Sequence, residues 1–115
     1  MRDPRLKTLA QQLVNYSIDV KPGENVLIEM IGGETELVKC LIEAVARRGG
    51  RPFVTLENRA VLRTLLLHAT PEQIAVWKEY DLKRMELMQG YIGIRAGDNA
   101  SELADVPPEK MRLYD

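Results

Sequence analysis

The sequence predicts an α/β domain in which a small parallel sheet of about three strands lies between helices, as a three-layer fold. A run dense in Val, Leu and Ile at residues 25–31 is the first sign of this class. Across Gly32-Gly33 it gives way to apolar residues at helical spacing, and the apolar run Phe53-Val54-Thr55-Leu56 follows. A strand, a crossover helix and a second strand within about thirty residues make a βαβ unit, whose crossover is nearly always right-handed.

The segment before this unit predicts a helix and a turn. Asp3 is a good N-cap and Pro4 suits the first helical position, and the apolar seam that follows ends near residues 16–18. Lys21-Pro22-Gly23-Glu24 is typical of a turn, because Pro presets φ and Gly accepts a positive φ. The first strand starts directly after this turn.

The crossover helix runs from Glu34 to the segment Arg47-Arg48-Gly49-Gly50. Cations in the last turn complement the helix dipole, and Gly at the C′ position accepts the left-handed conformation. Arg51-Pro52 opens the second strand, where Pro is tolerated. We expect one face of this helix to be buried against the sheet, with the residues Leu37, Val38, Leu41, Ile42 and Val45.

Three helices are expected between the second and third strands. Asn58 predicts a cap for a helix from Arg59 to about His68, and Thr70-Pro71-Glu72-Gln73 is a capping box. Because Asp81 interrupts the apolar seam after Trp77, we expect two short helices there, Pro71 to Trp77 and about Tyr80 to Met88. The buried face of the helix that Asn58 caps is expected to carry Val61, Leu62, Leu65 and Leu66.

Residues 89–95 predict a third strand, in which Tyr and Ile are bounded by glycines. We expect the strand order 2-1-3, because the crossovers Glu34–Gly49 and Arg59–Met88 then cover opposite faces and both stay right-handed. Val26 to Ile31 should then be apolar on both faces. Pro108 begins a helical pattern that the sequence does not complete, so we expect residues 1–115 to be one domain of a longer chain.

Composition excludes several classes of function. The chain has 115 residues, 45% of them hydrophobic and 29% charged, which is ordinary for a globular domain. A net charge of −1 without a basic stripe argues against a nucleic-acid partner. No apolar run is long enough for a membrane span, the start has no secretory pattern, and the single cysteine cannot form an internal disulfide. We expect a cytoplasmic protein.

Acidic and glycine-rich positions are the first candidates for chemistry. Gly32-Gly33-Glu34-Thr35 lies where α/β folds place ligand loops, but it lacks the P-loop lysine and the third glycine of a dinucleotide fingerprint. Glu34 and Glu36 in the first helical turn complement the dipole. Glu29 stands alone as a charge inside an apolar strand, and an edge-facing or solvent-facing position is the interpretation we favour. A structural turn is favoured for the glycines.

The remaining candidates are single residues. His68, the only histidine, stands at a helix end without the spacing of a zinc site, which indicates a structural cap. Cys40 lies near an apolar stripe and has no activating base in its sequence context, which indicates an inert position. We therefore predict no catalytic, cofactor-binding or metal-binding residues in this chain. Packing is expected of the large side chains Trp77, Tyr80, Met85 and Met88, which would form a partner surface if they were exposed.

Several stretches resemble the N-terminal region of the thermophilic metallo-aminopeptidases, the family of aminopeptidase T and aminopeptidase S. The likeness covers nearly all of the chain in order, and its weight comes from this collinearity. The stretches that carry it are residues 3–17, Val20-Lys21-Pro22-Gly23-Glu24-Asn25-Val26-Leu27-Ile28, the pattern Leu-Val-x-x-Leu-Ile-Glu-Ala at 37–44 with Arg-Arg-Gly-Gly-Arg-Pro after it, Tyr91 to Asn99, and Leu103 to Lys110.

The resemblance implies an exopeptidase that removes N-terminal residues from peptides with two divalent metal ions (Zn, Co or Mg), usually as a homodimer. It also implies that the metal ligands, which are Glu, His, Tyr and Asp side chains, lie in a later catalytic part of a chain several times longer. No residue here matches those positions, so no catalytic role carries over. The expectation is a non-catalytic N-terminal domain, inactive alone, whose partner is its own catalytic domain.

An alternative from another class stays open at this stage. The same residues are compatible with a freestanding α/β module that binds a ligand or a protein through the loops at the strand ends. The length of the parent reading frame distinguishes the two interpretations, because a catalytic part rich in Glu, His and Asp would have to follow residue 115.

Overall fold

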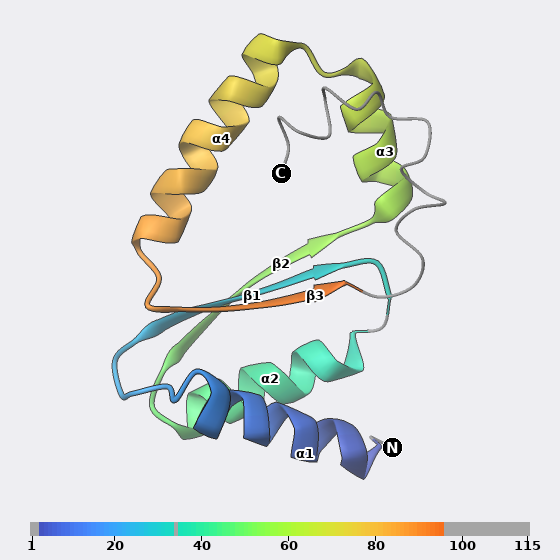
Figure 1. Cartoon of the computed structure of the whole chain (residues 1–115). Coiled ribbons are helices and arrows are strands. Elements are labelled where there is room, and N and C mark those ends of the chain that lie inside the picture. Colours follow the sequence, from blue (N-terminus) through green and yellow to red (C-terminus); the bar gives the residue numbers. More distant parts are fainter. Residues whose placement is uncertain (1–2, 34, 96–115) are drawn as a thin grey trace.

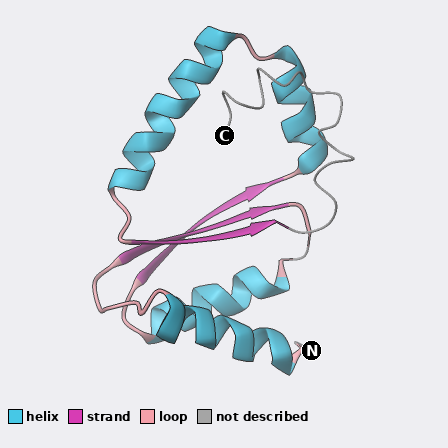
Figure 2. Ribbon diagram, in the orientation of Figure 1, coloured by secondary structure: helices cyan, strands magenta, loops and turns pink. Residues whose placement is uncertain are grey.

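The computed structural model describes residues 3–33 and 35–95. The expected α/β class is confirmed: three parallel strands in the order β2-β1-β3 separate two layers of helices (Figures 1 and 2). In chain order the elements are α1 (Pro4–Gln12), the π-helical turn η1 (Leu13–Ser17), β1 (Asn25–Ile31), α2 (Glu36–Arg47), β2 (Arg51–Glu57), α3 (Arg59–His68), α4 (Pro71–Glu86) and β3 (Gly90–Arg95).

The crossovers take opposite faces of the sheet, as the strand order requires. Helices α1 and α2 cover one face, and α3 and α4 form an arch over the other (Figure 1). The parallel register places Glu29 of β1 beside Thr55 of β2 and Gly93 of β3. Because side chains alternate along a strand, these three positions share the face under α3 and α4.

The local signals for turns and caps are confirmed. Asn58 Oδ1 accepts a hydrogen bond from Val61 N–H at 3.1 Å, and Thr70 Oγ1 accepts one from Gln73 N–H at 3.0 Å. Gly23 and Gly49 adopt φ values of 83° and 79°, and Gly23 N–H donates to the Gly49 carbonyl at 2.8 Å. The turn before β1 and the end of α2 are thus joined directly.

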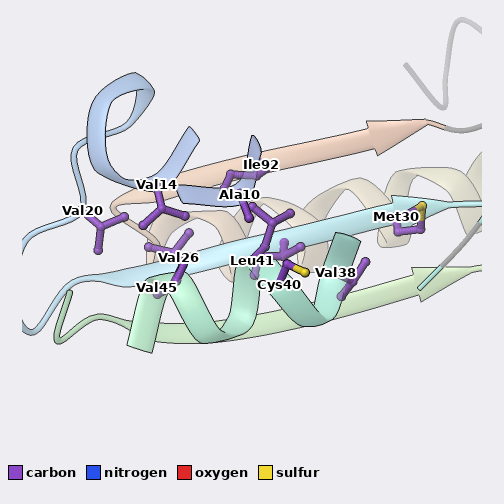
Figure 3. Close-up of a cluster of buried hydrophobic side chains, with 12 residues drawn as sticks. Ala10, Val14, Val20, Val26, Met30, Val38, Cys40, Leu41, Val45 and Ile92 are labelled. Atoms are coloured by element: carbon purple, nitrogen blue, oxygen red, sulfur yellow. The ribbon is translucent and has the colours of Figure 1, made fainter. Parts of the chain in front are cut away.

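The main hydrophobic core lies between the sheet and the layer of α1 and α2. Leu41 of α2 and Ile28 of β1 are fully buried there, together with Val14 of η1 (Figure 3). On the other side of the sheet, the buried cluster that the described residues form is small and consists of Ile31, Leu62 and Leu66. The two helical layers are therefore packed unequally.

Two expectations about the α3 and α4 layer are wrong. Residues 71–86 form one continuous helix rather than two short ones, because Asp81 on the seam binds Arg84 and faces a polar part of the sheet, so the helix needs no apolar residue there. In α3, Leu62 and Leu66 are buried as expected, whereas Val61 and Leu65 are 67% and 37% exposed. The buried face of α3 in the structure is thus about half as wide as the sequence pattern predicts.

Among residues 3–33 and 35–95, no helix has both the length and the apolar character that a membrane span requires.

Candidate functional site

A polar hollow of about 300 Å³ lies between α4 and the sheet. Glu57 and Arg95, the last residues of β2 and β3, place it toward the carboxyl ends of the strands, where α/β folds commonly bind ligands. Its lining comes from three strands and one helix: Glu29, Thr55, Glu57, Tyr91 and Arg95 from the sheet, with Trp77, Tyr80, Asp81, Arg84 and Met85 from α4.

Arg84 connects α4 to the sheet through this hollow. Its Nη2 donates to Glu29 Oε2 at 3.0 Å and its Nη1 donates to Thr55 Oγ1 at 2.6 Å, while Asp81 accepts a further bond one helical turn back. Burial opposes the charge, but the bond to Glu29 and the charge of Asp81 outweigh it, so the pKa of Arg84 lies above its usual value. The guanidinium therefore stays charged and neutralises its acidic neighbours.

Tyr91 forms a hydrogen bond with the other oxygen of the Glu29 carboxylate. Its hydroxyl donates to Glu29 Oε1 at 2.8 Å, and burial together with this bond raises the pKa of the phenol. The ring lies over Gly93: a Cβ atom there would come within 2.8 Å of the hydroxyl oxygen and 2.9 Å of the ring. Gly93 thus leaves the space that lets Tyr91 reach β1.

Glu57 and Arg84 each carry a buried polar atom in the hollow, Glu57 Oε2 and Arg84 Nε, without a hydrogen-bond partner among the described residues. Burial, and then the negative charge of Glu29, raise the pKa of the Glu57 carboxyl, and the positive charges of Arg84 and Arg95 oppose the rise only in part.

The position of Glu29 corrects the expectation from the sequence. We expected an edge-facing or solvent-facing charge, but β1 is the central strand and the Glu29 side chain is only 14% exposed. A charge is tolerated in this position because Arg84 and Tyr91 bond to both of its oxygens. We also expected Val26 to Ile31 to be apolar on both faces. Because of Glu29, the face of β1 under α3 and α4 is partly polar.

Among the other sequence candidates, Trp77, Tyr80 and Met85 line the hollow, and the rest lie apart from it. His68 is exposed at the last position of α3, and Cys40 is buried in the core on the opposite side of the sheet. Glu36 forms an ion pair with Lys39 at 3.1 Å on the first turn of α2. Gly32 and Gly33 both have a φ of 72°, as a turn after β1 requires, and Glu34 lies outside the described residues.

Sequence reasoning missed most of the polar hollow. Thr55, Tyr91 and Arg95 fall in strands that the sequence predicts, but the pattern gives them no part in a polar site, and it singles out neither Glu57 nor Arg84. One signal was present: Thr55 and Glu57 fall at alternate positions of one strand, a spacing that puts both side chains on one face, and Glu29 is the one charge inside the strand before it. Their meeting with Arg84 depends on a contact 55 residues apart in the sequence, which local patterns do not show.

The chemistry of the hollow is that of a hydrogen-bonded ion-pair network. Glu29 and Asp81 are engaged by Arg84, so these carboxylates do not offer a converging set of oxygens to a cation. Within residues 3–33 and 35–95 no group of three His, Cys, Asp or Glu side chains is placed to hold a metal ion. A divalent metal therefore does not fit the residues described here.

Comparison with known proteins identifies the family. No curated protein matches the chain. Among solved structures, wild-type AmpT from Thermus thermophilus matches with a TM-score of 0.67 and 21% sequence identity, over 96% of this chain and 29% of that chain. The fold is thus shared, and the present chain spans less than a third of the length of AmpT. The model of the thermophilic metalloprotease (M29) family matches residues 2–115, and the chain belongs to that family.

Proposed function

We propose that this chain is the non-catalytic amino-terminal domain of a cytoplasmic, metal-dependent aminopeptidase, a hydrolase that removes N-terminal residues from peptides. Membership of a metalloprotease family and the shared fold with AmpT support the parent activity. The observation that carries the non-catalytic role is the state of the acidic side chains: Glu29 and Asp81, the two carboxylates that Arg84 contacts, are held in a structural ion-pair network.

The parent activity requires groups that residues 3–33 and 35–95 of this chain do not bring together. Metal-assisted attack on a peptide carbonyl needs a cation that acidifies water and polarises the carbonyl oxygen, held by a fixed set of ligands. We propose that two divalent ions (Zn, Co or Mg) are held by the remaining part of the parent polypeptide. The role of the present domain is then to support that catalytic domain, which is its main partner, within a homodimer.

The test compares the 115-residue chain with the intact parent polypeptide. Each is loaded with cobalt, zinc or magnesium, then assayed for bound metal by elemental analysis and for hydrolysis of amino-acid anilides. We expect the 115-residue chain to show neither stoichiometric metal nor turnover, and the parent polypeptide to show both.

A matched variant makes the negative result informative. His68→Ala removes the only imidazole, on an exposed helix end where the fold should tolerate the change. Turnover by the 115-residue chain that is abolished both by a chelator and by His68→Ala would contradict the proposal. It would place an active site at the end of α3.

A further inference from the structure

Three hollows on the α3 and α4 side of the sheet share two bordering residues. Glu57, the last residue of β2, and Trp77 of α4 line the polar hollow and two further hollows of about 390 and 410 Å³. A small molecule placed at these two residues would therefore contact more than one hollow. Volumes of this size are typical of pockets that bind small molecules.

The hollow of about 390 Å³, which we call the apolar hollow, lies against the carboxyl end of β2 and the helices α3 and α4. Its apolar lining consists of Leu56, Val61, Leu62, Leu65 and Trp77. Three of these side chains, Leu56, Val61 and Leu65, are exposed in the structure. An apolar group that entered this hollow would remove apolar surface from water, which is favourable.

Two buried polar atoms at the polar hollow lack a hydrogen-bond partner among the described residues. One is an acceptor, Glu57 Oε2, and the other is a donor, Arg84 Nε. Buried polar groups are normally paired, so a bound molecule that supplied both partners would satisfy these atoms. The terminal torsion of a glutamate side chain has a broad range, which lets the Glu57 oxygen turn toward a donor in the hollow.

The charges around the polar hollow favour a donor that carries a positive charge. Among the described residues its lining holds three carboxyl groups and two guanidinium groups, which belong to Glu29, Glu57, Asp81, Arg84 and Arg95. One positive charge on a ligand would make the two signs equal in number. It would also offset the burial and the charge of Glu29, which raise the pKa of Glu57.

We propose that the polar and apolar hollows together bind the amino terminus of a peptide whose first residue has an apolar side chain. The terminal ammonium group would donate to Glu57 Oε2, and the carbonyl of the same residue would accept from Arg84 Nε. The first side chain would enter the apolar hollow, because Glu57 and Trp77 border both spaces. Trp77 and Tyr80 would add aromatic surface beside the ammonium, and aromatic faces attract cations.

A peptide terminus suits these features better than a plain amine or a carboxylic acid. An amine has no acceptor for Arg84 Nε, and a carboxylate would add a negative charge where acidic groups already outnumber basic ones. Binding here requires neither hydrolysis nor a metal ion, so it does not rest on the proposed function. A negative result would leave the parent activity to its own test of bound metal and turnover.

The experiment titrates the purified 115-residue chain with leucine amide at constant ionic strength and follows the fluorescence of Trp77, the only tryptophan. Because Trp77 borders both hollows, we expect a saturable change. Three further compounds each lack one feature: N-acetyl-leucine amide lacks the ammonium, isopentylamine the carbonyl and glycinamide the apolar side chain. Loss of the ammonium should weaken binding about tenfold or more, and the other two compounds should also bind more weakly.

These comparisons use the unchanged chain, so they decide the matter even without a variant. A fluorescence change that does not saturate, or equal binding of leucine amide and its acetylated form, would overturn the proposal. Binding of isopentylamine or glycinamide as tight as that of leucine amide would contradict such a peptide as the occupant.

A matched pair of variants tests the role of Glu57. Glu57→Gln keeps the shape of the side chain but removes its charge, and it should weaken the binding of leucine amide about tenfold. Glu72→Gln makes the same change on the exposed first turn of α4 and should bind leucine amide like the unchanged chain. A folded Glu57→Gln chain that binds leucine amide as tightly as the unchanged chain would also overturn the proposal.

Discussion

At the scale of single residues, Glu29 shows what a sequence pattern can predict and what it cannot. A carboxylate in the middle of a central strand is costly unless both oxygens find partners, and here Arg84 and Tyr91 supply them. These partners stand 55 and 62 residues further along the chain. The sequence shows that Glu29 is unusual, but only the fold shows why it is stable.

Gly93 is predicted to be needed for the contact between Tyr91 and Glu29. Gly93→Ala places a methyl group within 2.8 Å of the Tyr91 hydroxyl oxygen, so the ring must move and the bond to Glu29 is lost. We expect a loss of about 1–3 kcal/mol in the free energy of unfolding, measured by chemical denaturation.

Gly90 of the same strand supplies the control for this prediction. A Cβ atom at Gly90 would meet Ile18 and Val26 at 3.4 Å, which is ordinary contact, so Gly90→Ala should be nearly neutral. The double variant Gly93→Ala with Tyr91→Ala should lose less stability than the sum of the two single variants. In the double variant, the new methyl group at position 93 no longer meets the ring of Tyr91. Equal losses at Gly90 and Gly93 would show that the position of Tyr91 does not depend on this space.

The buried carboxyl of Glu57 is predicted to make stability depend on pH. Its pKa is raised by burial and by Glu29, so above about pH 4.3 the unfolded chain releases a proton that the folded chain still holds. Stability should therefore fall as the pH rises through the raised pKa. Glu57→Gln should remove this decline and stabilise the chain at neutral pH, as followed by urea denaturation between pH 4 and pH 8.

An exposed acidic residue tests whether this effect is specific to Glu57. Glu72→Gln, on the exposed first turn of α4, should leave the slope of stability against pH unchanged. If Glu57→Gln and the unchanged chain lose stability in parallel over this range, Glu57 is not the source of the decline.

At the scale of elements, signals carried by neighbouring residues were reliable. The caps at Asn58 and Thr70 and the turn at Gly23 each depend on atoms within three residues, and all were predictable. The break in α4 was predicted from Asp81, on the assumption that a helix seam must be apolar. That assumption fails where the sheet face opposite the helix is polar, and the sheet face was not predictable before the register of the strands was known.

Helix α2 gives the clearest prediction about an element. Leu41 is fully buried at the centre of its sheet-facing side, whereas the side chain of Glu43 is 43% exposed and forms an ion pair with Arg47 at 3.8 Å. Leu41→Ala should reduce the free energy of unfolding by about 2–5 kcal/mol, because it leaves a cavity in the main core.

Glu43→Ala on the same helix should change stability by less than about 0.5 kcal/mol. Both variants are compared by chemical denaturation. Losses of similar size would mean that the buried face of α2 has been assigned incorrectly.

At the scale of the whole molecule, the two helical layers differ in the interactions that hold them against the sheet. The layer of α1 and α2 encloses a core of Val, Ile, Leu and Ala side chains, and α4 buries only Ile74 fully among its sixteen residues. On the α4 side, the Arg84 network takes the place of a large apolar contact. The strand order was predictable from the handedness of the crossovers, but this inequality was not, because Val61, Leu65 and Val76 are apolar in the sequence and exposed in the fold.

The unequal packing predicts that the layers open at different rates in native-state hydrogen exchange. Amides of α4 should exchange well before those of α2 and β1, because local opening follows the amount of apolar surface that must be exposed. Arg84→Met should accelerate exchange in α4 by about tenfold, equivalent to about 1.4 kcal/mol, and leave α2 unchanged, since Arg84 ties this helix to Glu29 and Thr55. Lys83→Met, at the neighbouring exposed position of α4, is the matched control and should have no such effect. The opposite outcome is that α4 and β1 exchange together in a single cooperative opening and that Arg84→Met does not change the rate. That result would show that the small cluster around Leu66 is sufficient to hold this layer in place.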